Sequence, residues 1–145
     1  MVTQPAGVWV LHCDGGARGN PGPGAAAYAL YDPSGAEVDA RGEYLGSVTN
    51  NVAEYRGLIG GLRAAERHGA RRVRVHMDSE LVVRQMTGEY RVKNAGLKPL
   101  FEEAKQEAAR FAGVEYRAVR REENARADRL VNETLDRALE SESPR

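Results

Sequence analysis

Cysteine is nearly absent from the chain, since Cys13 is the only one among 145 residues. A lone cysteine excludes an internal disulfide and favours the reducing cytoplasm, which is the location we predict. No apolar run approaches the roughly 20 residues of a membrane-spanning helix, so we expect no membrane association. The first residues also lack the charged and apolar segments of a secretory signal peptide.

The chain also lacks a net charge, because 21 Lys and Arg balance 21 Asp and Glu. This balance argues neither for nor against a polyanionic partner. Histidine is scarce and scattered, which argues against a zinc site at His12, His68 or His76. The hydrophobic content of 41% is typical of a soluble globular protein. We therefore predict one domain over residues 1–145, with a core at about 7–139 and a polar tail at 140–145.

A glycine-rich stretch near the N-terminus is the most distinctive local feature. Val8–Cys13 is rich in β-branched and aromatic residues, which predicts a buried strand. Asp14 follows it, and the glycines and prolines between residues 15 and 24 predict a tight bend directly after this carboxylate. An Asp-Gly pair more often starts a turn, but a carboxylate at the end of a central strand also suits catalysis.

Hydrophobic periodicity divides the chain into strands first, then alternating helices and strands. Residues 32–35 form a strong hairpin turn, so the first three strands should make an antiparallel meander. Helical crossovers make parallel neighbours, so the last two strands should run parallel to the first. The prediction is an α/β fold with a five-stranded mixed sheet flanked by helices. The predicted strands are residues 8–13, 25–31, 36–45, 71–77 and 114–119, and the predicted helices are residues 51–68, 79–86, 97–111 and 124–139.

Three further acids lie where a surface charge is not expected. Glu54 lies one turn before Leu58 on the inward stripe of its helix, or it completes a capping box with Asn51. Asp78 ends a predicted strand, where α/β folds place ligand-binding residues, although it also suits a helix N-cap. Asp128 lies on the apolar stripe of the last helix, although an acid in the first turn also complements the helix dipole.

The four carboxylates lie at strand ends and helix starts, which can converge on one rim of the fold. Two carboxylates about 4 Å apart repel by roughly 4 kcal/mol at an effective dielectric constant near 20. A cluster of four therefore requires a bound cation, and an all-oxygen ligand set suits Mg²⁺ or Mn²⁺. Two such ions about 3.5–4 Å apart are the usual device for in-line displacement at a phosphodiester.

Four motifs in this order resemble those of type 1 ribonuclease H, and most closely its archaeal-like branch without a basic protrusion. The motifs are Asp14–Gly24, Thr49–Glu54, Asp78–Glu80 and Asn124–Leu130. The resemblance runs from about Val8 to Leu139. It implies a ribonuclease H-like fold and a monomeric endoribonuclease that binds RNA–DNA hybrids. The implied reaction is two-metal-ion hydrolysis of the RNA strand, which leaves 5′-phosphate and 3′-hydroxyl ends.

The resemblance also assigns roles to individual residues. The residues that match the metal-binding carboxylates, for two Mg²⁺ ions with Mn²⁺ as a substitute, are Asp14, Glu54, Asp78 and Asp128. The residues that match substrate contacts are Asn20, Asn50, Asn51 and Asn124, with Thr49 matching a phosphate contact on the DNA strand. Side-chain amides can reach the 2′-hydroxyl and base edges in a minor groove, which distinguishes RNA from DNA. Helix capping is the structural alternative for the neighbouring pair Asn50 and Asn51.

Two departures from the family pattern matter. Many members carry a loop histidine before the last catalytic Asp, and Arg121 stands at a similar place here. An arginine does not shuttle protons near neutral pH, so its expected catalytic role is electrostatic, and a solvated surface charge is the alternative. Many members also insert a helix and a basic loop that grips the hybrid. Without this insertion we expect weaker, more salt-sensitive binding, with part of the grip supplied by Arg84, Arg91, Lys93 and Lys98.

Two other functions compete with this prediction. One is a hybrid-binding module of the same fold without catalysis. Acids clustered opposite phosphate groups would not help a surface that only binds. The other is a nuclease of the same fold that also acts on double-stranded RNA. The segment Thr49–Asn51 favours hybrids without excluding such activity.

Overall fold

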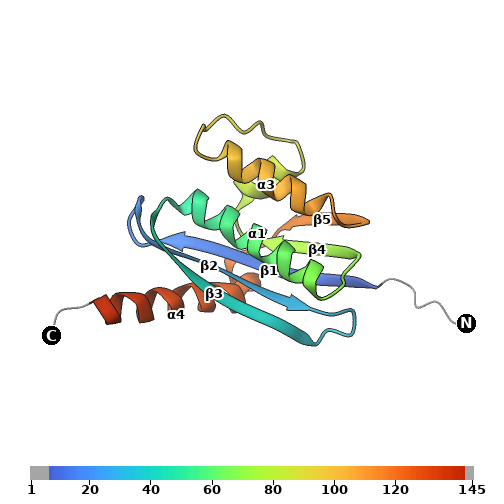
Figure 1. Ribbon diagram of the computed structural model, residues 1–145, viewed down its shortest axis with the longest axis horizontal. Helices are drawn as coiled ribbons and strands as arrows, with labels where there is room; N and C mark the ends of the chain where they lie inside the picture. The colour runs from blue at the N-terminus through green and yellow to red at the C-terminus, as the bar shows by residue number, and fades with distance from the viewer. Residues whose placement is uncertain (1–6, 143–145) are drawn as a thin grey trace, which may run out of the picture.

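One mixed sheet organises the molecule, and it confirms the predicted fold class. The structure, a computed structural model, describes residues 7–142. The five strands lie in the order β3-β2-β1-β4-β5 (Figure 1). β1, β2 and β3 pair antiparallel, whereas β4 pairs parallel with both β1 and β5. The strands are β1 (Val8–Ala17), β2 (Gly22–Tyr31), β3 (Glu37–Val48), β4 (Arg72–Met77) and β5 (Gly113–Ala118).

Helices cover both faces of this sheet. On one face α1 packs against β1 and β2, with α3 beside it, and on the other face α4 packs against β2, β3 and β1 (Figure 1). The helices are α1 (Asn50–Arg67), α2 (Glu80–Met86), α3 (Lys98–Ala108) and α4 (Ala125–Glu142), the last preceded by a 3₁₀ turn at Arg121–Asn124. α4 extends beyond the predicted end at residue 139, so residues 140–142 are helical. The rest of the predicted tail, 143–145, lies outside the described residues.

Two apolar clusters hold these layers together. The larger lies between the sheet and α1, where Leu58 and Leu62 meet Leu11 and Val75. The smaller lies under α4, where Val131 and Leu135 meet small β2 residues, Ala25 and Ala27. Small side chains on β2 let α4 approach the sheet closely. This approach brings the first turn of α4 to the end of β1.

The predicted bend directly after Asp14 is wrong, because β1 continues through the glycines to Ala17. Gly15 and Gly16 pair with Ala26 and Ala25 of β2. A Cβ on Gly15 would overlap the Ala53 carbonyl group of α1. The glycine is therefore needed for close approach of a helix, a demand that sequence patterning does not separate from a turn.

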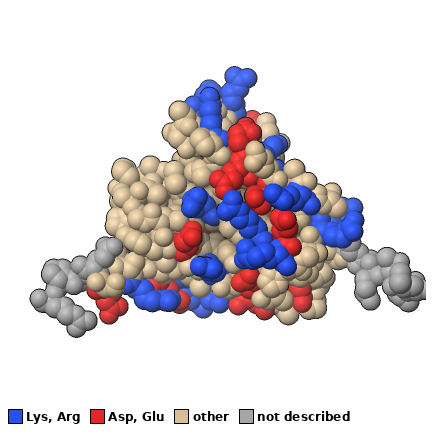
Figure 2. All heavy atoms as spheres, viewed as in Figure 1, with Lys and Arg blue, Asp and Glu red and all other residues tan. Residues whose placement is uncertain are grey.

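The balanced charges of the chain are unevenly distributed on the surface. On the face shown in Figure 2, Lys and Arg side chains gather over α1 and β3, with Asp and Glu side chains beside them. No helix in the described range 7–142 is both long and apolar enough to cross a bilayer.

Candidate functional site

Asp14 lies at the centre of a pocket built where β1, α1, β4 and α4 meet. Cys13 points into the core under α1, and successive side chains alternate along a strand. Asp14 is paired with Ala27, which packs under α4, and its side chain is only 5% exposed. The strand thus presents one carboxylate to the pocket and buries most of it.

Close packing of α1 brings Glu54 to the same place. A Cβ on Gly57 would overlap the Asp14 carbonyl oxygen, so only glycine permits this helix to lie so near β1. Glu54 Oε1 accepts a hydrogen bond from the Gly15 backbone N–H at 2.5 Å, and the residue is 6% exposed. The predicted capping box is wrong, because Thr49 is the N-cap and its Oγ1 accepts from Val52 N at 3.3 Å.

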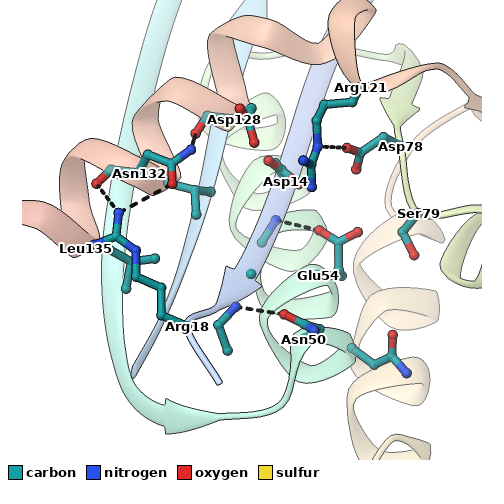
Figure 3. A pocket seen from close by; sticks show the side chains of 15 residues that line it. Asp14, Arg18, Asn50, Glu54, Asp78, Ser79, Arg121, Asp128, Asn132 and Leu135 are labelled. Atoms are coloured by element: carbon teal, nitrogen blue, oxygen red, sulfur yellow. Dashed lines mark hydrogen bonds and ion pairs between the residues drawn. The ribbon is translucent and has the colours of Figure 1, made fainter. Parts of the chain in front are cut away.

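Asp78 and Asp128 complete the acidic lining. Asp78 follows β4 directly, and its suggested N-cap role belongs instead to Ser79, whose Oγ accepts from Val82 N at 3.3 Å. Asp128 lies in the first turn of α4 and lines the same pocket. It can therefore complement the helix dipole and also contribute a carboxylate to the pocket. Figure 3 shows these carboxylates reaching into the pocket from separate elements.

Three of the carboxylates are close enough to share a cation. Ligand oxygens of Asp14, Glu54 and Asp78 all lie within 4.8 Å of one another. At an effective dielectric constant near 20, unit charges at such a distance repel by about 3 kcal/mol per pair. Burial raises the pKa of Asp14 to about 7, helped by the charges of Asp78 and Asp128 and opposed by a hydrogen bond with Glu54. Burial, followed by the charge of Asp14, likewise raises the pKa of Glu54 well above its usual range.

These observations test whether the donor set fits a divalent cation. The acids are buried together, and their raised pKa values show that the protein alone does not stabilise their charges. A hard divalent cation prefers oxygen ligands and would remove this repulsion. The pocket, of about 430 Å³, has room for ions and a phosphodiester. The residues present therefore fit Mg²⁺ or Mn²⁺.

Arg121, predicted to act through its charge, reaches the pocket. Arg121 lies in the 3₁₀ turn before α4, and its Nε is 3.9 Å from Asp78 Oδ2 (Figure 3). Its side chain is 79% exposed, so this ion pair is weak and screened by salt. The position allows an electrostatic effect on the carboxylates and a solvated charge at once.

The predicted substrate residues divide between this pocket and its neighbour. Asn50 and Asn51 line the acidic pocket, and Asn51 also lines an adjacent groove of about 350 Å³ together with Asn20 and Thr49. Asn20 Oδ1 accepts from Asn50 N at 3.0 Å, and Asn50 Oδ1 accepts from Ala17 N at 2.8 Å. Asn20 and Asn50 therefore also fix the loop between β1 and β2 against the start of α1.

Asn124 is not in the pocket, which contradicts its prediction as a substrate contact. The residue is fully buried. Its Nδ2 donates to the Cys13 carbonyl oxygen at 2.8 Å, and its Oδ1 lies 3.0 Å from Nδ1 of His12. Both ends of the amide are used inside the fold. Asn124 therefore anchors the start of α4, and with it Asp128, to β1.

Sequence reasoning missed Arg18 and Asn132, which line the pocket on the side away from Arg121 (Figure 3). Arg18 Nη2 lies 2.7 Å from Asp136 Oδ1, and 3.5 Å from both the backbone and side-chain oxygens of Asn132. Asn132 lies one helical turn after Asp128, and this spacing was a signal that could have identified it. No local pattern indicated that Arg18 would reach α4.

The chain matches a family model described as reverse transcriptase-like over residues 12–134. It is 44% identical over 133 residues to the bifunctional protein Rv2228c of Mycobacterium tuberculosis, covering 91% of this chain and 36% of that protein. The chain thus spans about a third of the length of that relative. It is 38% identical over 139 residues to ribonuclease HI of Halobacterium salinarum, covering 94% of this chain and 70% of the relative.

Solved structures agree with these sequence matches. The N-terminal RNase H domain of Rv2228c superposes with a TM-score of 0.90 at 41% identity, covering 94% of this chain and 99% of that one. LC11-RNase H1, isolated from compost, was solved in complex with an RNA/DNA hybrid. That structure superposes with a TM-score of 0.86 at 41% identity, covering 90% of this chain and 99% of the other.

Proposed function

The chain belongs to the ribonuclease HI family, and from this premise we propose that it hydrolyses the RNA strand of RNA–DNA hybrids. The products would carry 5′-phosphate and 3′-hydroxyl ends. The observation that carries the proposal is the meeting of Asp14, Glu54 and Asp78, whose oxygens lie within 4.8 Å of one another in an open pocket. The hybrid bound to the related LC11-RNase H1 supports the substrate class.

The same three carboxylates would hold the metal, with Asp128 as a fourth ligand from α4. We propose two Mg²⁺ ions in the substrate complex, with Mn²⁺ as a substitute. When bound, divalent ions would supply activation of the attacking water and stabilisation of the leaving 3′-oxygen. The protein's part is to hold the ligands rigidly, as the hydrogen bond from Gly15 N to Glu54 does.

Side-chain amides at the pocket would recognise the RNA strand. Asn50 uses its carbonyl oxygen within the fold, so its NH₂ group is the group proposed to donate to a 2′-hydroxyl. Asn51 and Asn20 line the groove next to the pocket, where they would contact base edges, and Thr49 would contact a DNA phosphate. Asn124 is left out of this set because of its burial, and acts by positioning α4.

Arginine charge at the rim would assist without proton transfer. Arg121 and Arg18 line opposite sides of the acidic pocket, where a substrate phosphate would enter (Figure 3). We propose that both attract the phosphate backbone. Arg84 is paired with Glu80 and Glu89, so the remaining grip would fall mainly on Arg91, Lys93 and Lys98, which are exposed. This small basic set predicts salt-sensitive binding.

We further propose that the protein acts as a monomer in the cytoplasm. This chain supplies all four carboxylates of the proposed metal site, which supports a site complete in one copy. Cys13, the lone cysteine, is buried and free, which suits a reducing compartment.

The decisive experiment is incubation with end-labelled RNA–DNA, RNA–RNA and DNA–DNA duplexes, each with Mg²⁺, Mn²⁺ or EDTA. We expect cleavage of the RNA strand of the hybrid only, and only with metal. Cleavage of RNA–RNA at a similar rate would favour the broader nuclease. Tight hybrid binding without cleavage under any metal would instead identify a binding module and overturn the proposed activity.

A further inference from the structure

A second hollow lies on the flank of α1 that faces β3, away from the acidic pocket. It has a volume of about 180 Å³, and its floor is formed by small residues, among them Ala26, Gly57 and Gly60. The strand pairing Tyr28↔Arg41 places Arg41 at its edge. Three turns of α1 supply the opposite wall. The arginines that line the hollow are Arg41, Arg56, Arg63 and Arg67.

Two of these four guanidinium groups have carboxylate partners that lie outside the hollow. Arg63 contacts Glu103 and Glu107 of α3. Arg67 lies 3.8 Å from Asp39 Oδ2 and 3.4 Å from the hydroxyl oxygen of Tyr28. Of the carboxylates named here, only that of Glu43 lines the hollow itself.

Arg41 and Arg56 are the two unpaired cations of the hollow. Neither has an ion pair or a side-chain hydrogen bond within residues 7–142. Four arginines and one carboxylate, Glu43, line the hollow, so its lining carries a net positive charge that favours an anion. The Tyr28 hydroxyl accepts a hydrogen bond from Arg67 and so holds that guanidinium group at the same wall.

Gly60 gives an independent reason to regard the hollow as a site. A glycine inside a helix is less favourable than an alanine, because it loses more backbone entropy. At Gly57 this loss is offset because glycine lets α1 lie close to β1, where an added Cβ would overlap the Asp14 carbonyl oxygen. A Cβ on Gly60, by contrast, would meet only the Tyr28 ring at 3.8 Å, an ordinary contact. Packing does not require glycine there, and its effect is to keep the floor of the hollow open.

We propose that this hollow binds one phosphate group through Arg41 and Arg56, with Arg67 as a further donor. Guanidinium forks match the oxygens of phosphate in pairs, and the hollow's volume suits a group of that size. Two sources carry the same chemistry. One is the backbone of a nucleic acid that continues beyond the acidic pocket, and the other is free phosphate or a mononucleotide.

Of these two ligands, only the nucleic-acid backbone rests on the proposed function. α1 begins at the acidic pocket with Asn50 and continues past the hollow to Arg67. At about 1.5 Å per residue, the helix spans roughly 25 Å, which matches about seven steps of a nucleic-acid strand at 3.4 Å each. A strand that followed the helix would place a phosphate over the hollow a few nucleotides from the cut.

Inorganic phosphate tests the site directly in the metal-free protein. Amide ¹H–¹⁵N spectra are recorded during a phosphate titration at constant ionic strength, and the signals of Gly57 and Gly60 are followed. We expect saturable shifts in the wild type and at least about tenfold weaker binding in Arg41→Gln/Arg56→Gln, since two charged donors to the phosphate are lost. Gly60→Leu, which keeps every charge but fills the floor, should also abolish the shift of the Gly57 signal.

Arg71→Gln is the matched control, because Arg71 is exposed and lies outside the hollow. It should bind phosphate as the wild type does. Shifts that never saturate, or an unchanged affinity in Arg41→Gln/Arg56→Gln, would overturn the proposal even if Gly60→Leu failed to fold.

Hybrid binding then distinguishes the two sources. In an Asp14→Asn background, hybrid affinity is measured against salt with and without Arg41→Gln/Arg56→Gln. A slope of log K against log [salt] that is smaller by about 0.9 identifies a lost backbone contact. If the slope is unchanged although the wild type binds inorganic phosphate saturably, free phosphate or a mononucleotide is identified as the ligand. Failure of the wild type to cut hybrids would reject the proposed function and leave the phosphate titration valid.

Discussion

The acidic pocket and the arginine hollow are both built on α1, and both gather like charges, but they differ in burial. Asp14 and Glu54 of the pocket are 5% and 6% exposed, whereas Arg41 and Arg56 of the hollow are exposed to solvent. Water screens the arginines, so the hollow is tolerable when empty. The buried carboxylates have no such screening, and burial raises their pKa values. A bound counter-ion should therefore relieve a larger repulsion at the pocket than at the hollow.

Neutralising one acid gives the largest expected effect. Asp14→Asn should reduce hybrid cleavage by about 10³-fold or more, above the loss from removing a single electrostatic donor, while hybrid binding persists. Without metal the variant should unfold at a higher temperature than the wild type, because a buried repulsion is gone. Cleavage assays at saturating Mg²⁺ and thermal unfolding in EDTA measure the two effects.

Glu102→Gln is the control for that change, since Glu102 is exposed on α3, outside the acidic pocket. It should alter neither cleavage nor the melting temperature. Wild-type turnover by Asp14→Asn would remove this residue from the metal site.

The two glycines of α1 separate the regions by packing alone. Gly57→Ala should lower the free energy of unfolding by about 1–3 kcal/mol, because its Cβ overlaps the Asp14 carbonyl and pushes the helix off β1. Gly60→Ala should raise it by up to about 1 kcal/mol through helix propensity. Urea unfolding at constant m-value measures both. Equal effects at the two positions would contradict the distinction between required and optional glycine.

Metal addition tests whether a bound cation relieves the repulsion between the carboxylates of the acidic pocket. At a free Mg²⁺ or Mn²⁺ concentration about ten times its Kd, binding should stabilise the fold by about 1.4 kcal/mol. The melting temperature would then rise by about 4 °C for a domain of this size. Calorimetry with and without EDTA measures the shift, which Asp14→Asn should reduce. A melting temperature that does not respond to either ion would count against a preformed site.

The smallest expected effect concerns the arginine that borders the acids. Arg121→Gln should lower cleavage about threefold at low salt, since exposed charges contribute up to about 1 kcal/mol, and the difference should shrink at high salt. Arg120→Gln is the matched control, because its side chain is 75% exposed and does not line the pocket. An equal loss in both variants would assign Arg121 to general surface charge.

Much of the candidate site was predictable because its signals are local. Periodicity located every strand and helix to within a few residues, and the motifs around Asp14, Glu54, Asp78 and Asp128 identified the carboxylates. Asn124 was misassigned as a substrate contact, because its partners, Cys13 and His12, lie more than a hundred residues away. A motif records that an amide is present, and only packing decides whether it faces solvent or the core.

The glycines show the same division. Sequence patterning predicts a bend wherever glycines cluster, yet Gly15 and Gly57 instead admit a helix against a strand. Arg18 was missed for a related reason, since its contact with Asp136 joins the first turn of the chain to its last helix.

By itself, the sequence determined the order of strands and helices, the mixed sheet and the identity of the four acids, because these depend on periodicity and on short motifs. The tertiary structure alone decided which three acids lie within 4.8 Å, that Asn124 is buried, and that Arg41 and Arg56 line one hollow. Strand register and helix approach set those distances, and both arise from packing between segments remote in the chain. Local sequence patterns therefore indicate which chemical groups are available, and tertiary packing decides where these groups come together.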